Sequence, residues 1–286
     1  MSEKPDTVQL LSQSFLKRFG TDCGNRLPEV VREIGLEVVY RKASSYEGAL
    51  LRIKGVPRGY VVLNSGIREE SRKRFTLAHE CGHFVLPDQQ ELSSPCSKEK
   101  IENWSEELYR PELEANRFAA EILMPRELVS AYLRVEPIMD SVKSISAAAR
   151  TSLTASAFRL INLTSFRAAV VWSSNNRVIW SKSSEEFVRW IPKSELSDAT
   201  FAADCFRHRS VPDRLEPVPA SAWLFEKGLR EDARIWEHSI PLPNYGAVIS
   251  LLVMREPVEA RDDSAPAEEE LDPNEFTLNR RRWPSK

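Results

Sequence analysis

The chain has 286 residues, of which 42% are apolar and 29% are charged, as expected for a folded protein of two or three domains rather than a disordered one. Lysine and arginine (40) nearly balance aspartate and glutamate (42), and the net charge of −2 excludes a global attraction to nucleic acids. The absence of a long apolar run, of a signal-peptide pattern and of paired cysteines predicts a cytoplasmic protein without disulfides.

The first part of the chain predicts two helices followed by a small sheet. Apolar spacing over residues 5–20 predicts one helix, and Pro28 favours the start of another over residues 28–34. Three short β-like runs follow, at residues 36–40, 49–53 and 59–63, and together they suggest an antiparallel sheet. The run 59–63 is either a sheet edge that pairs with an extended peptide substrate or an interior strand; the sequence leaves both open.

The next stretch, residues 74–86, carries the pattern His79-Glu80-x-x-His83 in apolar surroundings. On a helix, residues four apart share a face, so both imidazoles can reach one metal ion, with the Glu80 carboxylate beside them. This is the H-E-x-x-H arrangement of zinc peptidases, in which the glutamate takes a proton from a water. Cys81 falls about 200° around the helix from His79 and is expected to face away from the metal.

A polar connection over residues 87–110 leads to a second informative helix, bounded by Pro111 and Pro125. A catalytic zinc site needs a third protein ligand, and the candidates on this helix are Glu112, Glu114 and Glu121. Glu112 and Asn116 share one face, so one can bind the metal while the other orients a ligand histidine. A chance match on an ordinary core helix is the competing interpretation of the histidine motif.

Residues 74–83 (R-F-T-L-A-H-E-C-G-H) and 112–125 (E-L-E-A-N-R-F-A-A-E-I-L-M-P), preceded by Val61-Val-Leu-Asn64, resemble the ImmA/IrrE family of bacterial zinc metallopeptidases. The resemblance covers about residues 25–126. It implies an α+β fold with a zincin-type domain over residues 1–125, in which His79, His83 and Glu112 bind zinc and Glu80 is the catalytic base. Known members of that family act on helix-turn-helix repressors and thereby release stress-response or mobile-element genes. Cys81 departs from the leucine or isoleucine that is frequent in the family.

After the motifs the resemblance narrows to the IrrE-like branch. Residues 126–165 predict short helices at 127–133, 142–150 and 156–162, and the last two flank a tight turn, as in a helix-turn-helix. Basic residues outnumber acidic ones only modestly here, so DNA binding competes with a packing or substrate-docking role.

In the IrrE-like branch this position holds a GAF-like domain, so the resemblance implies a GAF-like α/β domain over residues 166–256 and, because such domains often bind small ligands, a small-molecule effector. Strands are predicted at 168–172, 177–181 and 246–254, the first two joined by the hairpin signal Ser-Ser-Asn-Asn, with helical or irregular chain between, including 194–207. His208 and His238 have no partner at metal-binding spacing. Residues 257–286 are expected to be a flexible charged tail.

These patterns predict a cytoplasmic zinc endopeptidase, with Glu80 as base and Tyr60 or Tyr109 as an additional oxyanion donor. The family resemblance implies that its substrate is a helix-turn-helix repressor. The alternative is a non-proteolytic regulator that keeps a structural zinc ion and binds DNA or a repressor through residues 127–163. A structural zinc site usually has four protein ligands, and no fourth ligand is apparent in the sequence, which favours catalysis.

Overall fold

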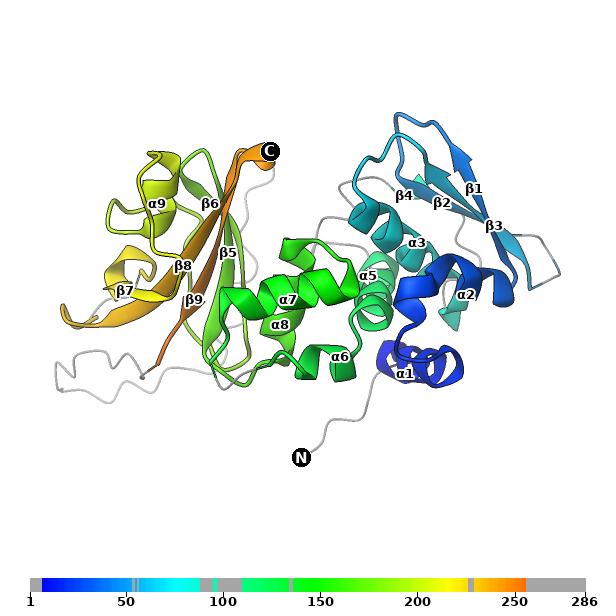
Figure 1. Cartoon of the computed structure of the whole chain (residues 1–286), viewed down its shortest axis with the longest axis horizontal. Helices are drawn as coiled ribbons and strands as arrows, with labels where there is room; N and C mark the ends of the chain where they lie inside the picture. Colours follow the sequence, from blue (N-terminus) through cyan, green and yellow to red (C-terminus); the bar gives the residue numbers. More distant parts are fainter. Residues whose placement is uncertain are drawn as a thin grey trace, which may run out of the picture.

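The computed structural model describes residues 7–52, 55, 57–87, 95–96, 110–133, 136–225 and 229–255. Within these ranges the chain forms two sheets with a layer of helices between them (Figure 1). The expected tail over residues 257–286 and nearly all of the connection over residues 87–110 lie outside the described residues.

The first part of the chain contains the helices and strands that its apolar pattern predicts. In order, the elements are α1 (Thr7–Phe19), the 3₁₀ helix η1 (Cys23–Arg26), α2 (Leu27–Glu33), β1 (Leu36–Arg41), β2 (Gly48–Arg52), β3 (Gly59–Asn64), α3 (Glu70–Val85), β4 (Pro95–Cys96) and α5 (Arg110–Leu123). Pro28 lies in the first turn of α2, where its missing N–H costs no hydrogen bond.

The first sheet has the strand order β1-β3-β2-β4. The prediction of an antiparallel sheet is wrong in one respect, because β1 pairs with β3 in parallel while β2 is antiparallel to both β3 and β4. The prediction left open whether β3 is an edge or an interior strand, and it is interior, with β1 on one side and β2 on the other. Since its backbone groups already bond to two strands, β3 offers no free edge to a peptide.

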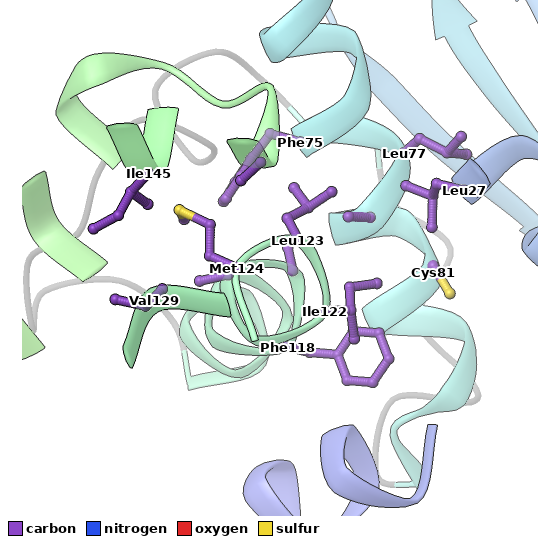
Figure 2. Packing of buried hydrophobic residues seen from close by; sticks show 14 of the residues in the cluster. Leu27, Phe75, Leu77, Cys81, Phe118, Ile122, Leu123, Met124, Val129 and Ile145 are labelled. Carbon is purple, nitrogen blue, oxygen red and sulfur yellow. The ribbon is translucent and has the colours of Figure 1, made fainter. Parts of the chain in front are cut away.

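Helices α3 and α5 pack against each other beside this sheet and form the centre of the larger apolar core. Figure 2 shows Cys81 of α3 next to Ile122 and Phe118 of α5, with Leu77 and Leu27 close by. Among the helices that the structure describes, none has both the length and the apolar character needed to cross a bilayer.

The helical layer consists of α6 (Arg126–Ser130), α7 (Met139–Ala149) and α8 (Leu153–Leu163), of which α7 and α8 lie between the two sheets (Figure 1). Helices α7 and α8 flank a tight turn as predicted, and Arg150 ends α7 in the left-handed conformation (φ 53°). Of the residues of α8, all of which are described, Asn162 alone is exposed. Its single basic residue, Arg159, is buried, bonds to both carboxylate oxygens of Glu121, and donates from Nε to the Met124 carbonyl.

The second sheet is antiparallel, with the order β6-β5-β9-β8-β7. Its part of the chain consists of β5 (Ala168–Ser174), β6 (Arg177–Ser183), α9 (Phe201–Phe206), β7 (Glu216–Pro219), η3 (Ala220–Ala222), β8 (Arg234–Leu242), η4 (Pro243–Tyr245) and β9 (Ala247–Val253). The predicted hairpin of β5 and β6 is confirmed, and both turn residues, Asn175 and Asn176, have positive φ. The sequence prediction missed β7 and β8.

Both faces of the second sheet are covered. Along β9, Ile249 and Leu251 join the core that continues through α7 and α8 to α3, whereas Val248 and Leu252 join a separate cluster with α9. This explains the uninterrupted apolar sequence of β9, which is typical of a strand buried on two sides. A GAF-like identity for this part and a helix-turn-helix-like identity for the helical layer both stay predictions.

Candidate metal centre

Helix α3 places His79 and His83 one turn apart in the protein interior. Residues 74–83 are all buried, and the exposed fraction of the two histidines is 0% and 6%. Their rings are nearly perpendicular, with centroids 4.6 Å apart, and the two Nε2 atoms are 3.0 Å apart. Both imidazoles therefore direct the same nitrogen to one point.

Helix α5 brings the Glu112 carboxylate to that point. Its Oε2 atom lies 3.2 Å from Nε2 of His79 and 3.5 Å from Nε2 of His83. A close helix crossing makes this reach possible: a Cβ atom added to Gly82 would lie 3.1 Å from Cα of Ala115 and 3.2 Å from its carbonyl oxygen. Because Gly82 has no side chain, α5 can approach α3 directly beside the histidines.

The hydrogen bond to Asn116 determines which nitrogen of His79 carries the proton. Nδ1 of His79 lies 2.8 Å from Oδ1 of Asn116, and since an amide oxygen can only accept, Nδ1 is the donor. In a neutral ring this leaves a lone pair on Nε2, which faces Glu112 and His83. The Asn116 side chain is buried, so its orientation is held by packing as well as by the bond.

The two histidines keep the Glu112 carboxylate in its ionised form. Burial alone would raise the pKa of Glu112, but hydrogen bonds to His79 and His83 and their charges lower this pKa well below its usual range. Two imidazole nitrogens and one carboxylate oxygen within 4.8 Å of one another form a donor set that suits a divalent metal. Such a set, buried and rich in lone pairs, fits a zinc ion.

Glu80 follows His79 on α3 and is fully buried, but it does not belong to this group of three. Its carboxylate lies against the backbone of β2, because a Cβ atom added to Gly48 would be 2.7 Å from Oε1 of Glu80. Glu80 is thus held between the motif helix and the neighbouring strand, one residue from the metal-binding group.

The other predicted candidates lie elsewhere. Glu114 forms an ion pair with Arg110, with Nε and Oε1 2.8 Å apart, and Glu121 pairs with Arg159. Tyr60 alternates with buried Val61 along β3 and therefore points to the sheet face opposite the apolar core. Tyr109 lies outside the described residues.

As expected, Cys81 belongs to the apolar core rather than to the metal-binding group, and burial raises the pKa of its thiol. Sequence reasoning missed Gly48 and Gly82. A glycine inside a helical pattern indicates that another segment packs closely against the helix there, so the role of Gly82 could have been predicted from the sequence. No sequence signal connects Gly48 with Glu80, because the contact depends on how β2 is placed against α3.

A cavity of about 150 Å³ lies beside Val178 of the second sheet, between residues 192–197 and Ser221–Phe225. Small-molecule sites usually measure about 300–1,000 Å³, so this cavity suits at most a very small ligand. The small-molecule effector stays a prediction.

The first part of the chain is thus a domain of mixed α+β structure with a buried histidine–glutamate group that could hold a metal ion. Residues 31–160 match the model of the Peptidase_M78 family, described as the IrrE N-terminal-like domain. The match includes α7 and most of α8 in addition to the metal-binding group.

A relative from Bacillus phage phi105, named "Uncharacterized immunity region protein 2", is 36% identical over 83 residues. The aligned part covers 29% of this chain and 49% of the phage protein, so the chain spans about half the length of that relative.

Proposed function

We propose that this chain is a cytoplasmic zinc endopeptidase that cleaves a helix-turn-helix transcriptional repressor and so releases stress-response or mobile-element genes. One observation carries the proposal: Nε2 of His79, Nε2 of His83 and Oε2 of Glu112 converge within 3.0–3.5 Å of one another, and Glu80 is the next residue after the first histidine. The match of residues 31–160 to the model of a peptidase family supports the same reaction class.

The residues have separate roles in this proposal. His79, His83 and Glu112 hold the ion, and Asn116 keeps His79 in the tautomer that presents a lone pair at Nε2. A zinc ion bound there supplies a Lewis acid that polarises a carbonyl and acidifies a water molecule. The Glu80 carboxylate accepts the proton of the attacking water and returns it to the leaving amine.

A catalytic rather than a structural ion fits the number of ligands. Among the residues that the structure describes, the group contains three ligands, whereas structural zinc sites usually have four protein ligands. The repressor substrate is inferred from the family resemblance, and the immunity-region name of the phage relative agrees with it.

The burial of α8 weighs against the DNA-binding alternative. A recognition helix needs an exposed face that can enter the major groove, but Asn162 is the one exposed residue of α8. The basic residue of this helix, Arg159, is bonded to Glu121 and is not available to DNA. The contacts of α8 with α7, β5 and β6 support a packing role for this helix.

The proposal is tested by incubating the zinc-loaded full-length protein with helix-turn-helix repressors encoded beside its gene, with and without a chelator. We expect a discrete cut in one repressor, which the chelator abolishes and added zinc restores. Intact repressors under all conditions, or a cut that persists after metal removal, would contradict the proposal.

A further inference from the structure

Gly48, the first residue of β2, lies close to the Glu80 side chain. A Cβ atom at this position would lie 2.7 Å from Oε1 and 3.2 Å from Cγ of Glu80, and 2.5 Å from Cγ2 of Thr76. Distances under about 3 Å require one of the two partners to move. Thr76 and Glu80 are one turn apart on α3, so Gly48 faces the same side of that helix as Glu80.

The backbone conformation of Gly48 is one that other residues can also adopt. Gly48 is not among the residues with positive φ, so alanine is compatible with its conformation. Its pairing with Leu63 of β3 and with Cys96 of β4 involves backbone groups that any residue offers. Neither backbone conformation nor sheet pairing therefore requires glycine here, and the requirement comes from the neighbouring side chains.

The consequence of an added methyl group differs for the fold and for the site. The crowded atoms belong to the side chains of Thr76 and Glu80 rather than to backbone. The stiff Thr76 side chain requires a small shift of β2 or α3, whereas the Glu80 contact is relieved by displacing the end of a long side chain. The mobile part of that side chain is the carboxylate to which we assign proton transfer. A small cost in stability should thus accompany a large change in the position of the base.

We propose that Gly48 is a positioning residue that keeps the Glu80 carboxylate beside the metal-binding group. The inference rests on the proposed peptidase function for its catalytic consequence, but the Gly48–Glu80 contact is testable without it. Any side chain at position 48 displaces the carboxylate, while His79, His83 and Glu112, which lie on α3 and α5, continue to bind zinc.

The contact is tested by urea unfolding of the zinc-loaded full-length protein and of the variants Gly48→Ala, Glu80→Ala and the double variant. We expect Gly48→Ala to lower the unfolding midpoint in the parent chain and to lower it clearly less in the Glu80→Ala background, because the carboxylate that it would strike is gone. Equal losses in both backgrounds would show that the residues do not interact, and would overturn the inference.

The positioning role is tested by zinc content and by cleavage of the repressor found in the incubation above. We expect Gly48→Ala to retain one equivalent of zinc and an unchanged KM, while kcat falls about 100-fold, the effect of a misplaced catalytic group. Adding Thr76→Ser removes the Cγ2 contact but not the Glu80 contact, so the loss of kcat should persist; recovery of kcat would assign the effect to Thr76.

Gly59 of β3 provides a matched control. A Cβ atom there would lie 2.6 Å from the backbone oxygen of Leu51, so Gly59→Ala should destabilise the sheet more than Gly48→Ala does, yet lower kcat less. The opposite order would overturn the positioning role. If the parent chain cleaves no repressor, the peptidase proposal fails, and the unfolding comparison still decides whether Gly48 determines the position of Glu80.

Discussion

Asn116 of α5 accepts a hydrogen bond from His79 of α3, with Oδ1 and Nδ1 2.8 Å apart, one turn beyond Glu112. The same helix face thus offers a carboxylate to both histidines and an amide oxygen to one of them. This joins the two helices through polar contacts at the point where Gly82 lets them meet.

Asn116→Ala should lower zinc affinity about 10- to 100-fold, because His79 loses the partner that fixes its tautomer and ring orientation. Competition with a chromophoric chelator measures this. Asn116→Asp keeps an acceptor oxygen and should retain most of the affinity, and exposed Asn162→Ala should have no effect. Unchanged affinity in Asn116→Ala would show that His79 is held by packing alone.

Glu112→Ala should remove zinc from the isolated protein, whereas Glu114→Ala should leave it bound. Glu112 provides one of three converging ligand atoms, while Glu114 pairs with Arg110 near the start of α5. Metal analysis after dialysis compares the two variants directly. Similar zinc loss from both would remove the support for Glu112 as the ligand.

Glu80→Gln should keep zinc and lose cleavage by at least about 100-fold, since the amide cannot accept a proton from water but has nearly the same shape. Zinc content and the cleavage rate are measured on the same preparation. A Glu80→Gln variant that cuts at the parent rate would refute the assignment of Glu80 as base.

The part of the site that lies on one helix was predictable from the sequence, because residues four apart on a helix always share a face. The geometry of His79 and His83 follows from that rule alone. Glu112 was one of three candidate glutamates; its spacing from Asn116 favoured it, but a glutamate near the start of a helix is also common without any metal. In the structure, the other two glutamates form ion pairs with arginines: Glu114 with Arg110, and Glu121 with Arg159. Glu112, by contrast, faces the two histidines.

Strands β7 and β8 were missed for a physical reason. Glu237 of β8 is fully buried. Because a charged residue is rarely buried, its presence in the sequence argues against a core strand at this place. The Glu237 carboxylate accepts hydrogen bonds from the Ala202 backbone, Trp223 and Ser239, partners whose positions only the tertiary structure reveals. β7 contains two prolines, which are tolerated because it is an edge strand.

Arg74 connects the motif helix with the helical layer and should contribute strongly to stability. Its guanidinium donates to the carbonyls of Ala149 and Arg150 at the end of α7, each at 2.6 Å, and to the Gly24 carbonyl at 2.5 Å. Arg74→Lys cannot reach all three carbonyls and leaves buried acceptors unsatisfied, so we expect a loss of about 2–3 kcal/mol in the free energy of unfolding.

Urea unfolding measures this loss, and Arg126→Lys, a substitution at an exposed arginine, should change stability by less than about 0.5 kcal/mol. If Arg74→Lys were as mild as the control, solvent rather than Arg74 would satisfy the three carbonyls.

His238 of β8 should make stability depend on pH. It is 4% exposed; burial lowers its pKa and the positive charge of Lys143 on α7 lowers it further, while Asp140 and Asp213 act in the opposite direction. Between the lowered pKa of the folded chain and the ordinary value near about 6.5, the unfolded chain binds a proton that the folded chain does not. The contribution of His238 to stability is therefore present above that ordinary value and is lost as the pH falls through this window.

Unfolding midpoints in urea between pH 5 and pH 8 should accordingly decrease toward low pH in the parent chain and decrease less steeply in His238→Gln. His208→Gln serves as the control, because His208 is exposed and its substitution should keep the parent slope. Identical slopes in the parent chain and His238→Gln would mean that the pKa of His238 does not differ between the folded and the unfolded chain, and that the pH dependence has another origin.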